Sequence, residues 1–144
     1  MEQELHRGRL IDHIQLVVRD LPASRRFYEA VFAVLKVPIG GSAADYFWAD
    51  ELFVSTADSQ AAQGHLTGRH HLAFQAADRE MVEAFYQAAL AAGGKDNGAP
   101  GERPNYHPGY YAAFVLDPDG NNIEAVFHGP HERSAASVTI SFGG

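Results

Sequence analysis

Two histidines and one glutamate have the residue types and positions expected of a shared metal site. His13 and His71 each stand near the start of a short apolar segment, and Glu124 interrupts the apolar run 123–127. An ionised carboxylate on a buried strand is unfavourable unless it is paired or bound to a metal. Two imidazoles and one carboxylate suit Fe(II), Mn(II), Ni(II), Co(II) or Zn(II) and leave positions for a substrate. The residue types therefore predict divalent-metal chemistry on a small molecule.

An internal repeat explains how ligands so far apart in sequence could be related. Sliding the sequence along itself aligns residues 11–20 with 69–78 and residues 27–30 with 85–88. The identical pairs are His13/His71, Asp20/Asp78, Phe27/Phe85, Tyr28/Tyr86 and Ala30/Ala88. In both copies an apolar run with an early histidine leads to an aspartate and then to an amphipathic segment. We interpret residues of about 10–57 and 69–128 as two copies of one unit, joined by a polar linker over about 58–68.

Each copy has the pattern of a strand, a helix and three further strands. Asp20 and Asp78 are suitable N-caps for the helices, and glycines 93–94 end the second helix. The predicted strands of the first copy are 10–18, one near 37–40, 45–48 and 52–56. Those of the second are one within the aligned segment 69–78, one somewhere within 94–100, 110–116 and 122–127. The sequence thus predicts an α+β fold of two β-α-β-β-β repeats whose curved mixed sheets form a cleft. Residues 98–109 are predicted as a mobile loop or lid, and 138–140 as an edge strand in the tail 129–144.

Strand alternation indicates which side chains enter the cleft. If His13 points inward then Gln15 does too, and His71 would face His13 across the pseudo-twofold axis. Tyr110 and Phe114 are an even number of residues apart on one predicted strand, so their side chains point to the same side. By the repeat, Tyr46 and Trp48 also face the cleft. We predict Tyr46, Tyr110 and His107 as groups for hydrogen bonding or proton transfer, with aromatic lining and a solvated loop histidine as the alternatives. The aromatic wall suggests an apolar or aromatic portion in the substrate.

Composition excludes several other classes of protein. The chain has 144 residues, 46% hydrophobic, with no cysteine and a formal net charge of -7. The lack of cysteine excludes disulfides, thiolate catalysis and iron–sulfur clusters. The negative charge disfavours nucleic acid, and no apolar run reaches the length of a membrane span. The polar start lacks the apolar core of a signal peptide, so we expect a single cytoplasmic domain over residues 1–144.

The sequence resembles the vicinal oxygen chelate superfamily, which contains glyoxalase I, extradiol dioxygenases, and fosfomycin and bleomycin resistance proteins. The resemblance covers residues 10–128 and rests on segments 11–14, 70–74 and 117–124, of which the Asp-Pro-Asp-Gly…Glu hairpin is the most specific. It implies paired β-α-β-β-β units, a divalent metal in the cleft, and a substrate that chelates the metal through two neighbouring oxygens.

Departures from the family patterns leave the reaction open. Matching the two copies places Val54 opposite Glu124, and valine cannot supply the fourth ligand of glyoxalase-type sites. Glu51 lies nearby in sequence but at a turn, so a three-ligand site is expected, with Glu51 or water as alternatives for the fourth position. Extradiol and fosfomycin enzymes have tyrosine where this chain has Phe114. His107 fits the extradiol spacing in part.

Two further positions bear on the fosfomycin enzymes. Arg133 resembles an arginine of those enzymes, but Gln15 replaces their threonine. We take Gln15, Trp48, Phe114 and Arg133 as substrate-binding candidates.

Two functions from different classes remain. The first is a metal-dependent lyase, isomerase or dioxygenase that acts on a small chelating substrate. The alternative is a metal-free small-molecule binding protein of the bleomycin-resistance type, although such proteins characteristically lack the ligand triad. A homodimer is expected, and the cleft could form within one chain or across the dimer.

Overall fold

Each half of the chain folds into one helix and one four-stranded mixed sheet. The computed structural model describes residues 2–7, 9–59, 62–134 and 138–143. The first half contains β2 (Ile14–Val17), α1 (Leu21–Leu35), β3 (Gly41–Ser42), β4 (Tyr46–Ala49) and β5 (Leu52–Ser55), in the sheet order β2-β5-β4-β3. The second contains β6 (His71–Gln75), α2 (Arg79–Ala91), β7 (Lys95–Glu102), β8 (Tyr111–Leu116) and β9 (Asn122–Phe127), in the order β6-β9-β8-β7. The predicted β-α-β-β-β arrangement is confirmed.

The helices begin where the sequence predicts, because an aspartate caps each of them. The Asp20 carboxylate accepts a hydrogen bond from the Ala23 amide at 3.1 Å, and Asp78 accepts from the Met81 amide at 2.8 Å. Equivalent capping in the two halves starts each helix four residues after the last residue of its first strand.

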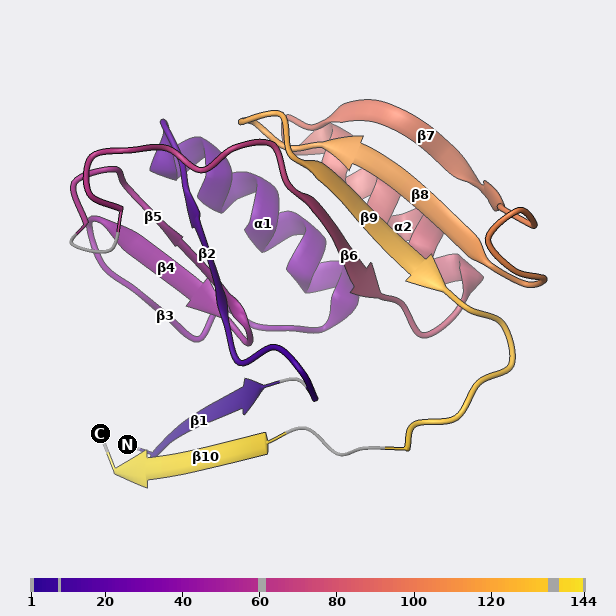
Figure 1. The fold of residues 1–144 in the computed structure, drawn as a ribbon, viewed down its shortest axis with the longest axis horizontal. Coiled ribbons are helices and arrows are strands. Elements are labelled where there is room, and N and C mark those ends of the chain that lie inside the picture. Colours follow the sequence, from indigo (N-terminus) through magenta and orange to yellow (C-terminus); the bar gives the residue numbers. More distant parts are fainter. Residues whose placement is uncertain (1, 8, 60–61, 135–137, 144) are drawn as a thin grey trace.

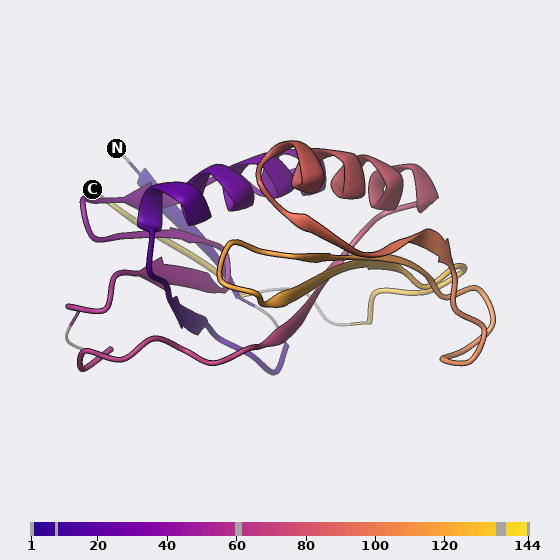
Figure 2. The ribbon, with the colours of Figure 1, turned by 90° about the horizontal axis from the view of Figure 1, so that it is seen from above.

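Both helices cover the same side of the molecule and leave the other side of each sheet uncovered (Figure 2). The core lies between the helices and the sheets, with fully buried side chains from every layer, including Leu16, Phe27, Phe47, Phe85 and Ile123. We call the side of each sheet away from its helix the open face. Side chains on this face alternate along the strands with those of the core.

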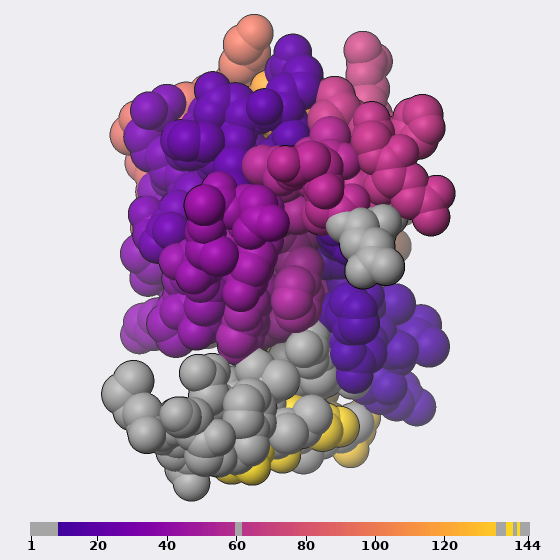
Figure 3. Space-filling view, turned by 90° about the vertical axis from the view of Figure 1, so that its left-hand side faces the viewer, coloured from indigo at the N-terminus to yellow at the C-terminus, as the bar shows by residue number. Residues whose placement is uncertain are grey.

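The two halves meet without joining their sheets. No hydrogen-bonded ladder links the two four-stranded sheets of the described residues. Strands β2 and β6 face each other across the middle of the molecule and run in opposite directions (Figure 1). Helices α1 and α2 pack against each other. The described part of the linker lies along one edge of the first half, with β10 below that half (Figure 3).

The predicted hairpin at Asp117 also ties the halves together. Asp117 is 4% exposed, and its carboxylate accepts hydrogen bonds from the backbone amides of Asp119 and Asn121 at 2.9 and 2.8 Å. The Tyr28 hydroxyl, from α1, donates to the same carboxylate at 2.5 Å, and the Asn121 side-chain amide donates at 2.9 Å. Asn121 then accepts from the His70 amide at 2.8 Å. One aspartate therefore connects α1, the β8–β9 turn and the start of β6.

The buried Tyr28 makes stability depend on alkaline pH. Burial, followed by the charge and hydrogen bond of Asp117, raises the pKa of Tyr28 well above its ordinary value. Above about pH 10 this phenol ionises in the unfolded chain before it does so in the folded chain, so folding loses stability as pH rises. We expect the free energy of unfolding to fall more between about pH 9 and pH 11 in the natural chain than in Tyr28→Phe. Urea unfolding at both pH values measures this, and equal falls in the two proteins would contradict it.

Other elements differ from the sequence expectations at their ends. The first strand is shorter than predicted, so His13 lies directly before it, and the next strand is Gly41–Ser42 and not 37–40. Residues 98–102 belong to β7, where two register shifts let the strand continue, so only the turn after Glu102 remains of the predicted lid.

The predicted tail strand forms β10 (Val138–Gly143), which pairs antiparallel with β1 (Glu2–Arg7), a strand that the sequence did not predict. Among the described helices, none has the length and apolar character needed to cross a membrane.

Candidate functional site

Glu124 lies at the centre of the open face of the second sheet. Its neighbours in register are Ala73 on β6 and Phe114 on β8, and Gly98 of β7 lies opposite Phe114. The Glu124 side chain is only 2% exposed. The short strand β9 thus places a carboxylate on the side of the sheet that has no helix over it, but among neighbours that shield it from water.

Two side chains bind the Glu124 carboxylate, one on each oxygen. The His71 Nε2 atom lies 2.9 Å from Oε1, and the Tyr110 hydroxyl donates a short hydrogen bond to Oε2. The His71 ring also stacks on Phe114, with ring centroids 6.0 Å apart and planes at 23°. The structure therefore brings together three of the residues that the sequence singled out, namely His71, Glu124 and Tyr110.

The donor types of this pair suit a divalent metal ion, because an imidazole nitrogen and a carboxylate oxygen are both common ligands of such ions. His71 Nε2 and Glu124 Oε1 lie at hydrogen-bond distance, 2.9 Å. About the same distance separates two ligands that stand 90° apart on an octahedral ion with bonds of about 2.0–2.1 Å. The hydrogen bond from the Tyr110 hydroxyl to Oε2 is of the kind that orients ligating carboxylates.

Tyr110 keeps its proton more firmly than an ordinary tyrosine. Burial, together with the hydrogen bond and negative charge of Glu124, raises the pKa of Tyr110. Tyr111 points to the opposite side of the sheet, where its hydroxyl donates to Glu83 of α2 at 2.6 Å. Tyr110 therefore lies on the open face and Tyr111 on the helix side, as strand alternation predicts.

A histidine pair borders Tyr110. His107 Nε2 lies 2.9 Å from His128 Nδ1, and both rings contact the Tyr110 ring edge to face at 5.3 Å. His107 Nδ1 lies 2.8 Å from the Pro108 carbonyl, to which it donates. The sequence carries no signal for this pairing, because the two residues meet only through the β8–β9 hairpin.

The open face of the first sheet carries aromatic side chains in place of the carboxylate. Its central row is Gln15, Phe53, Trp48 and Gly41, the counterparts in register of Ala73, Glu124, Phe114 and Gly98. Phe53 is therefore opposite Glu124 in the repeat, and the predicted match to Val54 is wrong by one residue. That shift moves a residue to the other side of the strand, and Val54 is fully buried under α1.

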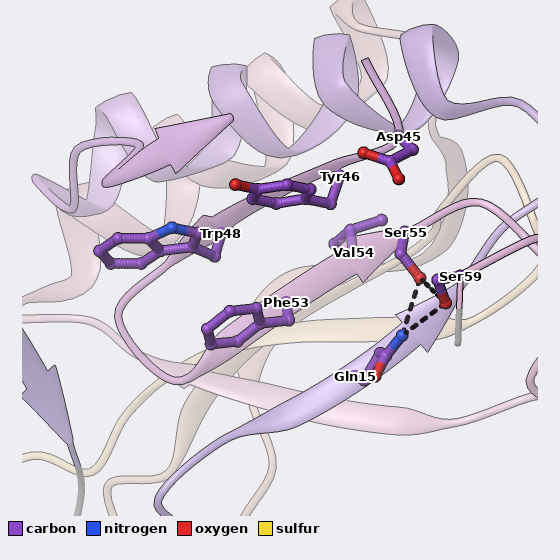
Figure 4. Close-up of a pocket in the computed structure, with 8 residues that line it drawn as sticks. All are labelled: Gln15, Asp45, Tyr46, Trp48, Phe53, Val54, Ser55 and Ser59. Atoms are coloured by element: carbon purple, nitrogen blue, oxygen red, sulfur yellow. Dashed lines mark hydrogen bonds between the residues drawn. The ribbon is translucent and has the colours of Figure 1, made fainter. Parts of the chain in front are cut away.

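A hollow of about 380 Å³ lies on this aromatic face (Figure 4). Trp48 and Phe53 stack with centroids 5.8 Å apart and planes at 18°, and Tyr46 is 40% exposed beside them. At the polar end, the Gln15 amide nitrogen donates to Ser55 at 2.8 Å and to Ser59 at 3.3 Å. Gln15, Tyr46 and Trp48 thus come together as the sequence predicts, whereas the contribution of Ser59 was missed because it lies in the predicted linker.

One chain does not gather the three predicted ligands. The described residues hold no group of three or more histidine, cysteine, aspartate or glutamate side chains able to bind one metal ion. His13 contacts Asp12 at 2.7 Å and the Phe53 ring at 5.3 Å. It directly precedes β2, whereas His71 opens β6, and these strands run in opposite directions (Figure 1). His13 and His71 therefore lie at opposite ends of the two central strands.

The two remaining candidates lie away from the Glu124 cluster. Arg133 is exposed in the segment after β9, and no contact within the described part of the chain links it to either open face. Glu51 lies in the turn between β4 and β5, where the sequence placed it.

Comparison with known proteins gives one family. The model of the Glyoxalase/Bleomycin resistance protein/Dioxygenase superfamily matches residues 10–125. A search of curated proteins finds no match.

Solved structures share the fold. A glyoxalase/bleomycin resistance protein from Albidiferax ferrireducens T118 is 27% identical, with a TM-score of 0.72, covering 81% of this chain and 98% of its own. A glyoxalase-related enzyme from Fulvimarina pelagi is 22% identical, with a TM-score of 0.68 and coverages of 89% and 100%. Lactoylglutathione lyase from Agrobacterium tumefaciens is 21% identical, with a TM-score of 0.60 and coverages of 83% and 93%.

Proposed function

Because this chain belongs to the Glyoxalase/Bleomycin resistance protein/Dioxygenase superfamily, we propose that it is a divalent-metal-dependent enzyme. Its substrate would be a small molecule that chelates the ion through two neighbouring oxygens, in a lyase, isomerase or dioxygenase reaction. The observation that carries this proposal is the buried Glu124 carboxylate, with an imidazole nitrogen 2.9 Å from one oxygen and a tyrosine on the other.

The third ligand of the proposed site comes from a second copy of the chain. His71 and Glu124 occupy one end of the central strands, and His13 occupies the other. A homodimer with a twofold axis could place the His13 end of each chain against the His71 end of its partner. Each dimer would then hold two sites, each with two ligands from one chain and one from the other.

Other residues on and beside the two open faces have proposed roles next to the metal ligands. A divalent ion such as Fe, Mn, Ni, Co or Zn supplies Lewis acidity toward a carbonyl or enol oxygen when bound. Tyr110 holds its proton on the hydroxyl and orients Glu124, and it can donate a hydrogen bond to developing negative charge. His107, held by the Pro108 carbonyl, and Tyr46 are the proposed groups for proton transfer. Phe114 forms an apolar wall beside His71.

A metal-free binding protein is the second candidate, and one observation favours it. The two hydrogen bonds from His71 and Tyr110 satisfy the buried carboxylate without any ion. In that case the cleft would hold a small molecule and catalyse nothing. Metal content separates the two candidates.

The test combines elemental analysis with complementation between two variants. We expect the natural chain to hold one metal ion per chain, and His13→Ala and His71→Ala each to hold almost none. Unfolding the two variants together and refolding them makes about half of the dimers mixed, and each mixed dimer regains one intact site. Metal content should therefore return to about a quarter of the natural value.

Each outcome has a distinct meaning. No recovery in the mixture, with metal bound by the natural chain and by neither variant alone, would show that the site forms within one chain. Metal retained by His13→Ala alone would show that the site does not need His13. No metal in the natural chain, even after reconstitution, would overturn the enzyme proposal and favour the binding protein. If metal is bound, oxygen uptake with a catechol separates a dioxygenase from a lyase or isomerase.

A further inference from the structure

The open face of the first sheet carries a stacked pair of aromatic rings. A Cβ atom on Gly40 would lie 2.2 Å from the Trp48 ring, and one on Gly41 would lie 2.6 Å from the indole nitrogen. Only glycine at both positions leaves room for the indole where it lies. Phe53, its neighbour in register, stacks against the indole with ring centroids 5.8 Å apart and planes at 18°. Because the two ring planes are nearly parallel, a planar aromatic partner can pack against them in the same orientation.

The polar end of the same hollow has a fixed orientation. Ser59 accepts from the Ala62 amide at 3.2 Å, so its own hydrogen is free to bond Ser55 at 3.3 Å. Ser55 in turn donates to the Thr56 carbonyl at 3.2 Å. Both hydroxyl oxygens can therefore accept from the Gln15 amide nitrogen. This arrangement assigns the nitrogen of Gln15 to the serines and leaves its Oε1 without a donor among the described residues.

An amide oxygen with no protein donor is suited to accept from a ligand. The hollow that Gln15 borders is about 380 Å³, and Tyr46 and Asp45 line its upper side (Figure 4). A pocket of this kind, mostly apolar with a few oriented polar groups, binds a small ligand and fixes its direction. Here the aromatic part would rest on Trp48 and Phe53, and a hydroxyl or amino group would donate to Gln15.

We propose that this face is the subsite for a planar aromatic ring that carries a hydrogen-bond donor. The inference rests on the proposed function, because it names the class of substrate whose chelating oxygens would reach the metal. His13 links this subsite to the proposed metal site, since its ring packs on Phe53 with centroids 5.3 Å apart. The aromatic ring would thus lie beside the histidine that the first half contributes to a metal site.

The chain contains its own probe for this subsite, because Trp48 is its single tryptophan. We would titrate protein stripped of metal by a chelator and dialysed with 4-cyanophenol, following the indole emission. The comparison ligands are 4-cyanoanisole, which has the ring but no donor, and cyclohexanol, which has the donor but no aromatic ring. We expect saturable binding of 4-cyanophenol, weaker binding of 4-cyanoanisole, and none of cyclohexanol.

Three variants sharpen the test while keeping Trp48. Phe53→Leu should weaken 4-cyanophenol about fivefold to tenfold, the value of one aromatic contact. Gln15→Met should remove the preference for 4-cyanophenol over 4-cyanoanisole. Tyr106→Leu, an exposed aromatic residue of the other half, should change neither.

The proposal is overturned if cyclohexanol binds as well as 4-cyanophenol, if Phe53→Leu binds as the natural chain does, or if no emission change occurs. Since the titration uses metal-free protein, its failure leaves the metal site standing. Conversely, loss of the metal proposal in elemental analysis leaves ring binding to be judged by this titration alone.

Discussion

We expect replacement of Glu124 by glutamine to lower the affinity of the proposed site for a divalent metal by at least about a hundredfold. The amide has nearly the shape of the carboxylate, so the side chain still fits among Ala73 and Phe114. It carries no negative charge, however, and an amide oxygen is a much weaker ligand for these ions than a carboxylate. Equilibrium dialysis with Zn²⁺ or Ni²⁺, followed by elemental analysis, measures the change.

A matched control comes from the other side of the same sheet. Glu83 of α2 also accepts a hydrogen bond from a tyrosine, at 2.6 Å from Tyr111, but it faces away from the site. Glu83→Gln should bind metal as the natural chain does. If both variants lose metal equally, the loss comes from a general effect of removing a carboxylate, and Glu124 is not a ligand.

Replacing Asp117 by alanine destabilises the fold by about 3–5 kcal/mol. The carboxylate accepts four hydrogen bonds, from the Tyr28 hydroxyl, the Asp119 and Asn121 amides and the Asn121 side chain. Its loss leaves several buried donors unpaired, each at a cost of about 1–3 kcal/mol, partly relieved by water. Urea unfolding at neutral pH measures the difference in free energy.

Asp119, two residues further along the same turn, gives the control. Its carboxylate binds Arg19 at 3.0 Å, and the arginine side chain is 66% exposed. The Asp119 side chain is 13% exposed, but water reaches the pair through the exposed arginine. A screened ion pair of this kind contributes about 0–1 kcal/mol, so Asp119→Ala should cost much less than Asp117→Ala. Similar losses in the two variants would mean that the turn is sensitive to any change of charge, and that the buried network is not the cause.

The repeat and strand alternation predicted most of the fold and the face of the sheet on which Tyr110, Gln15 and Trp48 lie. Asp20 and Asp78 identified both helix starts. Strand alternation correctly placed Tyr110 and Tyr111 on opposite sides of the sheet. The register error at Val54 arose because the segments between helix and last strand differ in length, so the repeat could not fix that strand to within one residue. A one-residue error reverses the face of every side chain.

The remaining features depend on contacts that no local pattern reports. Tyr28 reaches Asp117 across the boundary between the halves, and His107 meets His128 only after the hairpin has formed. The separation of His13 from His71 depends on how the two halves are placed side by side. The strand and helix patterns of the sequence predict the fold of each half, but not how the two halves are placed relative to each other.

The two sheets share no ladder in the described part of the chain, and this has a consequence for how the protein can evolve. Mutations on the face around Trp48 can accumulate without shifting any strand that carries His71 or Glu124. The ligand contacts of the first half can thus change while the strands of the second half keep their positions. In such an architecture a change of codon at position 41 alone would displace the indole. New specificities should therefore arise by few substitutions, concentrated in the first half of the gene.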